Sequence, residues 1–190
     1  GGVAGGATAA ARIRRLDEEA EIFVFERTGY ISYANCGLPY YIGGTIEDAE
    51  ELTLQTPESF WKRFRVQMKV HHEVTAIHPE RKTVSVKNLE NAEEFEESYD
   101  KLLLSPGAKA VLPKISGIGN EKLFTLRTVE DTFKIKKYIE EKKPKSVILA
   151  GGGFISLELA ENLRESGMVV TIVQRPKQLM NPFDPDMASF

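Results

Sequence analysis

One sulfur and two glycine-rich turns are the parts of this sequence that could do chemistry. Cys36 is the only cysteine among the 190 residues. Its neighbours are polar or small, namely Ser32, Asn35, Gly37 and Pro39. A buried structural cysteine usually packs among aliphatic side chains, so we expect this thiol to be accessible. A thiolate is the reactive form of cysteine, and the start of a helix stabilises it through unpaired N–H groups. Two interpretations stay open here, a reactive cysteine and an inert loop thiol.

The first glycine-rich turn, Gly-Gly-Val-Ala-Gly-Gly, occupies residues 1–6. An amphipathic helix is expected over 7–16, followed by an apolar strand over 21–25 that ends at Glu26, 20 residues after Gly6. In a dinucleotide-binding unit the pyrophosphate lies on such a helix N-terminus, and the acid accepts hydrogen bonds from the ribose hydroxyls. Val3 replaces the second glycine of the general fingerprint, and no strand precedes Gly1. We therefore expect that the first strand of this unit is missing from the chain.

The second glycine-rich turn has every part of the fingerprint. A strand is expected over 146–150, a turn over 151–156, a helix over 157–163 and a second strand over 169–173. Ser156 takes the place of the last glycine. Gln174 stands where a site for NAD usually has an acid, and Arg175 follows it. A neutral amide beside a cation does not repel a 2′-phosphate, so NADPH is favoured slightly and NADH stays open.

The rest of the chain predicts the elements that must position these turns. Thr56 and Pro57 mark the start of a short helix, and a second helix is expected to open over 126–131 and to end near Lys142. Alternating apolar residues predict an antiparallel meander over 66–98. It contains the three histidines, His71, His72 and His78, without metal-ligand spacing, so no metal site is expected. A buried strand is expected over 99–104, ending at a Ser105-Pro106-Gly107 turn.

These elements predict an α/β fold with two Rossmann-like units, which bind FAD and NAD(P), and an inserted antiparallel β-meander. We expect an FAD-binding domain over 1–112 and the truncated N-terminal part of an NAD(P)-binding domain over 113–190.

The composition, 42% hydrophobic and 28% charged, fits a globular protein with a core. A net charge of -3 without a basic stretch argues against a nucleic-acid partner. We find no membrane span and no signal peptide, and one cysteine fits a reducing cytoplasm.

Two dinucleotide sites with a cysteine just after the first suggest an electron path. A nicotinamide at the second site would give hydride to a flavin at the first, and the reduced flavin would pass electrons to Cys36. One cysteine cannot close an internal disulfide, so its oxidised form would be a mixed disulfide with a small thiol or a sulfenic acid. The substrate would then be a disulfide, a persulfide or a peroxide.

Residues 32–40, together with the opening turn and the turn over 151–155, resemble the single-cysteine pyridine nucleotide-disulfide oxidoreductases. The resemblance covers the whole chain and is strongest to the coenzyme A-disulfide reductases, with persulfide reductases and NADH oxidases or peroxidases as relatives. It implies that Cys36 is the redox nucleophile beside a flavin. The implied FAD contacts are Gly1, Gly2, Val3, Ala4, Gly5, Gly6, Glu26, Arg27, Ser105, Pro106 and Gly107.

The resemblance also implies a nicotinamide-nucleotide site and a coenzyme A site. The first would consist of Gly151, Gly152, Gly153, Phe154, Ile155, Ser156, Glu158, Gln174 and Arg175. The second would consist of Thr8, Arg12, Arg15, Ser32, Asn35 and Arg63. The family also has parts that this chain lacks, including the rest of the nucleotide domain and a C-terminal dimerisation domain. We therefore expect a homodimeric parent enzyme, whose partner subunit supplies a tyrosine to the active site, and an inactive fragment.

Three functions follow from these observations. The first is reduction of coenzyme A disulfide or a related persulfide by NAD(P)H through FAD and Cys36. The second keeps the flavin but uses oxygen or peroxide as acceptor, with Cys36 cycling through a sulfenic acid. The third is a nucleotide-binding redox sensor without catalysis, in which Cys36 is a regulatory thiol.

Overall fold

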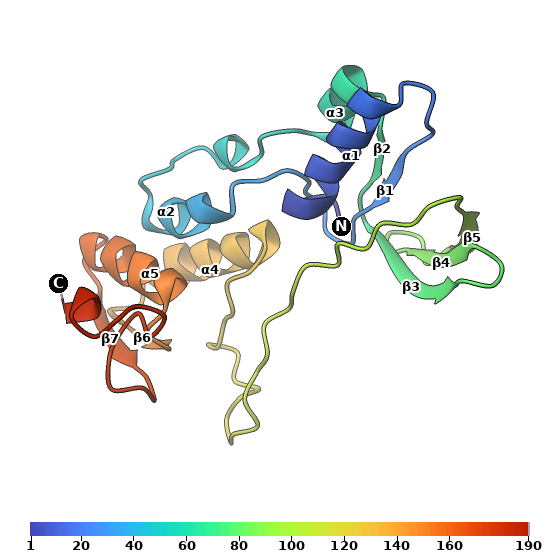
Figure 1. Cartoon of the computed structure of the whole chain (residues 1–190). Helices are drawn as coiled ribbons and strands as arrows, with labels where there is room; N and C mark the ends of the chain where they lie inside the picture. Colours follow the sequence, from blue (N-terminus) through green and yellow to red (C-terminus); the bar gives the residue numbers. More distant parts are fainter. Residues whose placement is uncertain (190) are drawn as a thin grey trace. The chain divides into compact units, whose positions relative to one another are not determined.

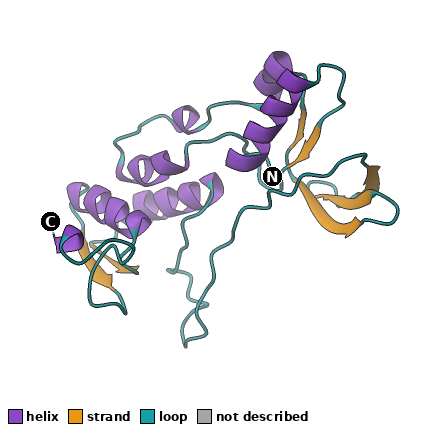
Figure 2. Ribbon diagram, in the orientation of Figure 1, coloured by secondary structure: helices purple, strands orange, loops and turns teal. Residues whose placement is uncertain are grey.

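The computed structural model describes residues 1–189, and contacts divide the chain into two compact units (Figure 1, Figure 2). The first unit combines Gly1–Ala34 with Thr53–Lys109, and the second combines Asn35–Leu52 with the chain from Ala110 onward. The segment around Cys36 therefore packs with the later part of the chain. The domain boundary expected at 112 and 113 stays a prediction.

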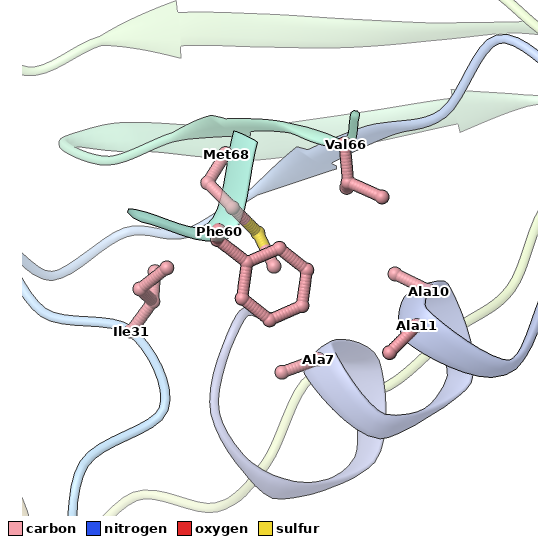
Figure 3. Close-up of a cluster of buried hydrophobic side chains, with 7 residues drawn as sticks. All are labelled: Ala7, Ala10, Ala11, Ile31, Phe60, Val66 and Met68. Carbon is pink, nitrogen blue, oxygen red and sulfur yellow. The ribbon is translucent and has the colours of Figure 1, made fainter. Parts of the chain in front are cut away.

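The first unit is built on a short parallel pair of strands covered by helices. Its parts are α1 Ala4–Leu16, β1 Phe23–Phe25, α3 Pro57–Phe64 and β2 Gln67–Lys69. Strand β1 pairs in parallel with β2. Small residues on one face of α1 allow close approach to the strands. Figure 3 shows the resulting core, which consists of Ala7, Ala10, Ala11, Ile31, Phe60, Val66 and Met68.

The antiparallel meander is shorter than the sequence predicted. It consists of β3 His72–His78, β4 Thr83–Asn88 and β5 Glu94–Ser98, in the order β3-β4-β5. The expectation that it begins at Val66 is wrong, because residues 67–69 form β2 and pair with β1. Val66 and Met68 alternate as a meander strand would, but they point into the core against α1. No group of residues within the described range could hold a metal ion.

The prediction of a buried strand over 99–104 is also wrong. Residues 101–104 form no strand, and Leu103 and Leu104 are 54% and 65% exposed. A strand needs a neighbour for its backbone hydrogen bonds. Among residues 1–189, β1 pairs only with β2, so no strand pairs with this segment. The apolar residues 102–104 therefore form no strand with any described part of the chain.

The second unit contains the complete glycine fingerprint. Its regular elements are α2 Leu38–Gly43, α4 Val129–Lys142, β6 Ser146–Ala150, α5 Phe154–Glu165 and β7 Val169–Val173, with short 3-10 turns at Asn35–Gly37, Ala49–Leu52 and Met187–Ser189. Strands β6 and β7 pair in parallel, as expected from a strand-turn-helix-strand order. The core consists of Ile42, Leu149, Leu159, Leu163 and Met168. One of these residues, Ile42, comes from α2 and so ties the Cys36 segment to this unit.

The starts of the helices divide into two kinds. Thr56 caps α3 and Thr128 caps α4, each through a capping box in which the third helical residue bonds back to the cap. Helices α1 and α5 begin at the two glycine-rich turns, and no described side chain caps either of them. In the described chain, no helix has both the length and the apolar character required to cross a bilayer.

Candidate functional site

The opening turn of the first unit is packed so tightly that side chains would not fit. A Cβ atom on Gly6 would lie 1.7 Å from the Gly1 carbonyl oxygen, and one on Gly1 would lie 2.4 Å from the Ser105 carbonyl oxygen. A Cβ atom on Gly2 would meet Ile31 at 2.8 Å. These glycines therefore allow the turn, α1 and the segment at Ser105 to approach one another closely. Val3 is tolerated because it stands at the N-cap, partly exposed.

The turn after residue 104 lies against this glycine turn, and its contact with a flavin stays a prediction. The Ser105 hydroxyl donates to the Gly1 carbonyl over 3.4 Å, and its Cβ would be 3.3 Å from a Cβ on Gly5. Pro106 is exposed, and Gly107 has a φ of 69°, a left-handed conformation that favours glycine. The structure therefore brings together two segments that lie about 100 residues apart in the sequence.

Glu26 is buried directly after β1 and is hydrogen-bonded to the opening glycine turn. Its Oε2 accepts a hydrogen bond of 2.7 Å from the Gly2 amide, and its Oε1 accepts from the amide and hydroxyl of Thr28, each at 2.8 Å. A carboxylate offers about four acceptor positions, so three of them are already used by the protein. The carboxylate thus fixes the glycine turn, and its bond to ribose stays a prediction.

An uncapped helix start is a suitable place for a phosphate. The first amides of α1 point out of a helix that begins at Ala4 with no side chain bonded to them. Unpaired N–H groups and the positive end of the helix dipole attract anions. The threonine capping boxes of α3 and α4 close the same position in those helices. The residues present therefore fit a dinucleotide pyrophosphate at α1, and the same reasoning applies to α5.

A row of exposed polar residues follows on α1. Thr8, Arg12 and Arg15 are spaced at four and three residues and are all exposed, so they share one helix face. Within residues 1–189, neither Arg12 nor Arg15 forms a hydrogen bond or an ion pair. Arg14 differs, because its guanidinium donates to the carbonyls of Phe64, Asp17, Glu18, Ala20 and Arg65. Arg12 and Arg15 thus remain available for an external anion.

Three other predicted residues of the first unit have different surroundings. Arg27 pairs with Glu73 of β3 at 3.6 Å, on the surface. Ser32 lies beside the glycine turn, since its amide donates to the Gly2 carbonyl over 3.0 Å, and its φ is 44°. Arg63 is exposed on α3 and stacks over Phe64. The structure therefore brings Ser32 to the opening glycine turn, and it gives Arg63 a local partner on its own helix.

The second glycine turn is closed from one side by the residues after β7. Gly151 has a φ of 110°, and its amide donates to the Val173 carbonyl over 2.8 Å. A Cβ atom on Gly152 would lie 2.1 Å from Oε1 of Gln174. Gly153 has open space around it and is the N-cap of α5. Gln174 thus lies directly against the second glycine turn.

The remaining residues of this site lie at the start of α5 and beyond β7. Phe154 and Ile155 are about half exposed, and Phe154 contacts Phe183 edge-on with ring centroids 5.9 Å apart. Ser156 and Glu158 are partly exposed, on the first two turns of α5. Arg175 is exposed after Gln174. The assignment of these residues to a nicotinamide-nucleotide site stays a prediction.

Cys36 is exposed and forms no disulfide with the described residues, and it lies in the turn that leads into α2. Leu38 and Pro39, the first residues of that helix, are buried. Asn35 is exposed, and its Oδ1 accepts a hydrogen bond of 3.4 Å from Arg127. Asn35 and Cys36 therefore belong to the second unit, whereas Ser32 belongs to the first. The assignment of Cys36 to the flavin stays a prediction.

Sequence reasoning missed three residues that hold the Cys36 segment. They are Arg127 before α4, Lys136 on α4 and Asn162 on α5. The only signal in the sequence was an asparagine within the apolar stripe of a helix, between Leu159 and Leu163. The contacts of Arg127 and Lys136 could not be predicted from the sequence, because lysine and arginine usually lie on solvated helix faces.

Two glycine turns stand at uncapped helix starts. The first precedes the parallel pair β1 and β2, and the second joins β6 to α5 beside the parallel pair β6 and β7. This arrangement defines a dinucleotide-binding α/β protein. Over residues 1–190 the sequence matches the family described as pyridine nucleotide-disulphide oxidoreductase, and the chain belongs to this family. It is 46% identical over 187 residues to the coenzyme A disulfide reductase of Staphylococcus aureus strain NCTC 8325 / PS 47. That alignment covers 98% of this chain and 42% of the relative.

Two solved structures are similar to the whole chain. Reduced Bacillus anthracis CoADR-RHD is 54% identical with a TM-score of 0.97, and the match covers 100% of this chain and 34% of that protein. The NAD-dependent persulfide reductase from A. fulgidus is 35% identical with a TM-score of 0.93, covering 100% of this chain and 36% of that protein. The expected family and its Rossmann-type fold are thus confirmed. The chain spans less than half the length of these relatives.

Proposed function

We propose that this chain is the flavin- and nucleotide-binding part of an enzyme that reduces coenzyme A disulfide, or a related persulfide, with NAD(P)H. The observation that carries the proposal is an exposed, solitary Cys36 in a chain with two uncapped glycine turns. The names of the similar proteins, coenzyme A disulfide reductase and NAD-dependent persulfide reductase, support this substrate class. We further propose the domain limits 1–112 and 113–190, a cytoplasmic location and a homodimeric parent.

The two turns would hold the two dinucleotides. The opening turn with Ser105 would bind FAD, and the turn at Gly151–Gly153 with Gln174 and Arg175 would bind NAD(P)H. FAD, when bound, would carry two electrons from NAD(P)H to the sulfur. The neutral amide of Gln174 and the cation of Arg175 tolerate a 2′-phosphate, which supports the use of NADPH beside NADH. The exposed row Thr8, Arg12 and Arg15 would bind the phosphates of coenzyme A.

The reaction itself would take place at Cys36. Its thiolate attacks one sulfur of the substrate disulfide, the S–S bond breaks, and one coenzyme A thiolate leaves. A mixed disulfide then joins Cys36 to the second coenzyme A. Two electrons cleave this bond, release the second thiol and restore the thiolate. Overall, one disulfide, one NAD(P)H and one proton give two thiols and one NAD(P)⁺.

The decisive experiment is Cys36→Ser in the full-length protein. We expect the variant to retain bound flavin, seen in its visible absorbance, and to lose NAD(P)H oxidation with coenzyme A disulfide. Undiminished turnover would disprove the proposal. If the parent instead consumes oxygen or peroxide without coenzyme A, and dimedone labels Cys36 after peroxide, the acceptor is oxygen or peroxide. A colourless protein without turnover would point to the non-catalytic redox sensor.

A further inference from the structure

The segment that carries Cys36 is fixed by the second unit from several directions. The Cys36 turn runs directly into α2, and Ile42 of α2 packs with Leu159 and Leu163 of α5. A six-residue helix has little stability by itself in water. The place of α2, and with it the place of Cys36, therefore depends on what the helix packs against.

The closest contact lies at the end of α2. A Cβ atom on Gly43 would be only 2.6 Å from both Cβ and Oδ1 of Asn162. The hydroxyl of Ser166, one turn further along α5, donates to the Gly43 carbonyl over 3.1 Å. Asn162 is 2% exposed. Its Nδ2 donates to the Glu158 carbonyl over 2.8 Å, which orients the amide so that Oδ1 can accept from Thr45 over 3.4 Å.

Helix α4 holds the same segment from a second side. Lys136 Nζ donates to the Tyr41 carbonyl over 2.9 Å and lies 3.7 Å from the centroid of the Tyr41 ring. Phe133 contacts that ring edge-on with centroids 5.7 Å apart. On the other side of Cys36, Arg127 donates to Asn35. Contacts before and after the sulfur thus restrain its position.

Helix α5 also begins at the glycine turn proposed to bind the nucleotide phosphates. Gly153 is its N-cap, and Asn162 lies between two and three turns further along the same rigid element. We propose that Asn162 is a positioning residue for Cys36, which seats α2 on the helix that starts at the nucleotide turn. This inference rests on the proposed function, because it assigns a place in that reaction to a residue outside the chemistry.

The test uses Gly43→Ala in the full-length protein, because the added methyl group collides with the rigid Cβ of Asn162. We expect kcat with coenzyme A disulfide to fall by about tenfold or more, since a displaced nucleophile reacts poorly. The KM for NADPH should stay unchanged, and the alkylation rate of Cys36, followed by mass spectrometry of its peptide, should change. Gly119→Ala is the matched control, since nothing lies within 4 Å of a Cβ there.

Two further variants keep the inference falsifiable. Gly43→Ala combined with Asn162→Gly removes the colliding atoms and should restore part of kcat. Asn162→Ala alone keeps the Cβ but loses the amide, and should lower kcat and alter Cys36 alkylation even if Gly43→Ala does not fold. Normal kcat and alkylation in Asn162→Ala would overturn the inference. If Cys36→Ser is inactive while Asn162→Ala is normal, only the positioning role fails and the proposed function stands.

Discussion

Three arginines within four residues of α1 have two different roles. The guanidinium of Arg14 bonds to five backbone carbonyls, at the end of α1, in the following loop and at the end of α3. Carbonyls at a helix C-terminus lack partners within the helix, so Arg14 satisfies groups that would otherwise need water. Arg12 and Arg15 project from the exposed face instead. The helical period places one arginine inward and two outward.

Replacing Arg14 with Met should therefore destabilise the first unit. Loss of several charge-assisted bonds to partly buried carbonyls should lower the free energy of unfolding by about 2–4 kcal/mol. Thermal and urea unfolding of the full-length protein would measure this loss. Arg15→Met is the matched control, and its effect should stay within about 0.5 kcal/mol because the side chain is exposed. Equal stability of the two variants would contradict the role of Arg14.

The outward pair should act on the substrate rather than on stability. For Arg12→Gln combined with Arg15→Gln, we expect the KM for coenzyme A disulfide to rise roughly tenfold at moderate salt. Two exposed cation–phosphate contacts of under 1 kcal/mol each account for this factor. The KM for NADPH and the melting temperature should not change. An unchanged KM for coenzyme A disulfide would place the phosphates elsewhere.

At the scale of elements, the four longer helices differ in how their first turns are satisfied. Threonine capping boxes close α3 and α4, whereas α1 and α5 start at glycine turns without a side-chain cap. A capping side chain would occupy the amides that a phosphate needs. The threonine caps therefore stabilise α3 and α4, whereas the first amides of α1 and α5 have no side-chain cap and suit the proposed dinucleotide phosphates.

Thr128→Ala tests the first half of this division. The variant loses the 3.2 Å hydrogen bond that the Asp131 amide donates to the Thr128 hydroxyl, and should be destabilised by about 1 kcal/mol. The KM for NADPH should remain that of the parent, because the cap lies on α4 and not at the nucleotide turn. Lys134→Ala, exposed on the same helix, is the control and should unfold like the parent. A raised KM in Thr128→Ala alone would show that the capped helix contributes to nucleotide binding.

At the scale of the whole molecule, each glycine turn belongs to a different compact unit. The opening turn, Glu26 and Ser105 lie in the first unit, and the turn at Gly151 lies in the second. Each unit has its own hydrophobic core. A ligand stabilises the part of a protein that binds it, so the two cofactors should protect different segments.

Removal of the flavin from the full-length protein should show this division. We expect amide hydrogen exchange to accelerate in α1 and β1 and to change little in β6, α5 and β7. Addition of NADP⁺ to the flavin-free protein should then slow exchange at the start of α5. Hydrogen-exchange mass spectrometry resolves these segments. Equal acceleration across both units would show that they unfold together.

Much of the fold follows from local signals in the sequence. Glycine spacing predicted both turns, and Thr56 with Pro57 predicted the start of a helix, because caps and turns depend on a few adjacent residues. The pairing of strands that lie far apart in the sequence was harder to predict. Residues 67–69 alternate like a meander strand, yet they pair with β1, and residues 101–104 are apolar without forming a strand. A strand is defined by its partner, which composition does not reveal.

The candidate site divides in the same way. Cys36 and the glycines were predicted because their types and spacing suggest chemistry, whereas Arg12 was implied by the family resemblance. The contact of Asn162 with Gly43 was not, since it joins residues 119 positions apart and depends on how α2 packs on α5. Arg14 was indistinguishable from its neighbours until the backbone carbonyls around it were known.

The membership of residues 35–52 in the second unit has a consequence for biosynthesis. The ribosome completes this segment 102 residues before it reaches the first residue of α5, Phe154. At translation rates of about 5–20 residues per second, the nascent thiol waits roughly 5–20 s for the helices that will receive it. During that interval Cys36 meets the cell's small thiols and oxidants without its native surroundings. Until α5 has been made, Cys36 therefore lacks the contacts that hold its segment in the folded protein.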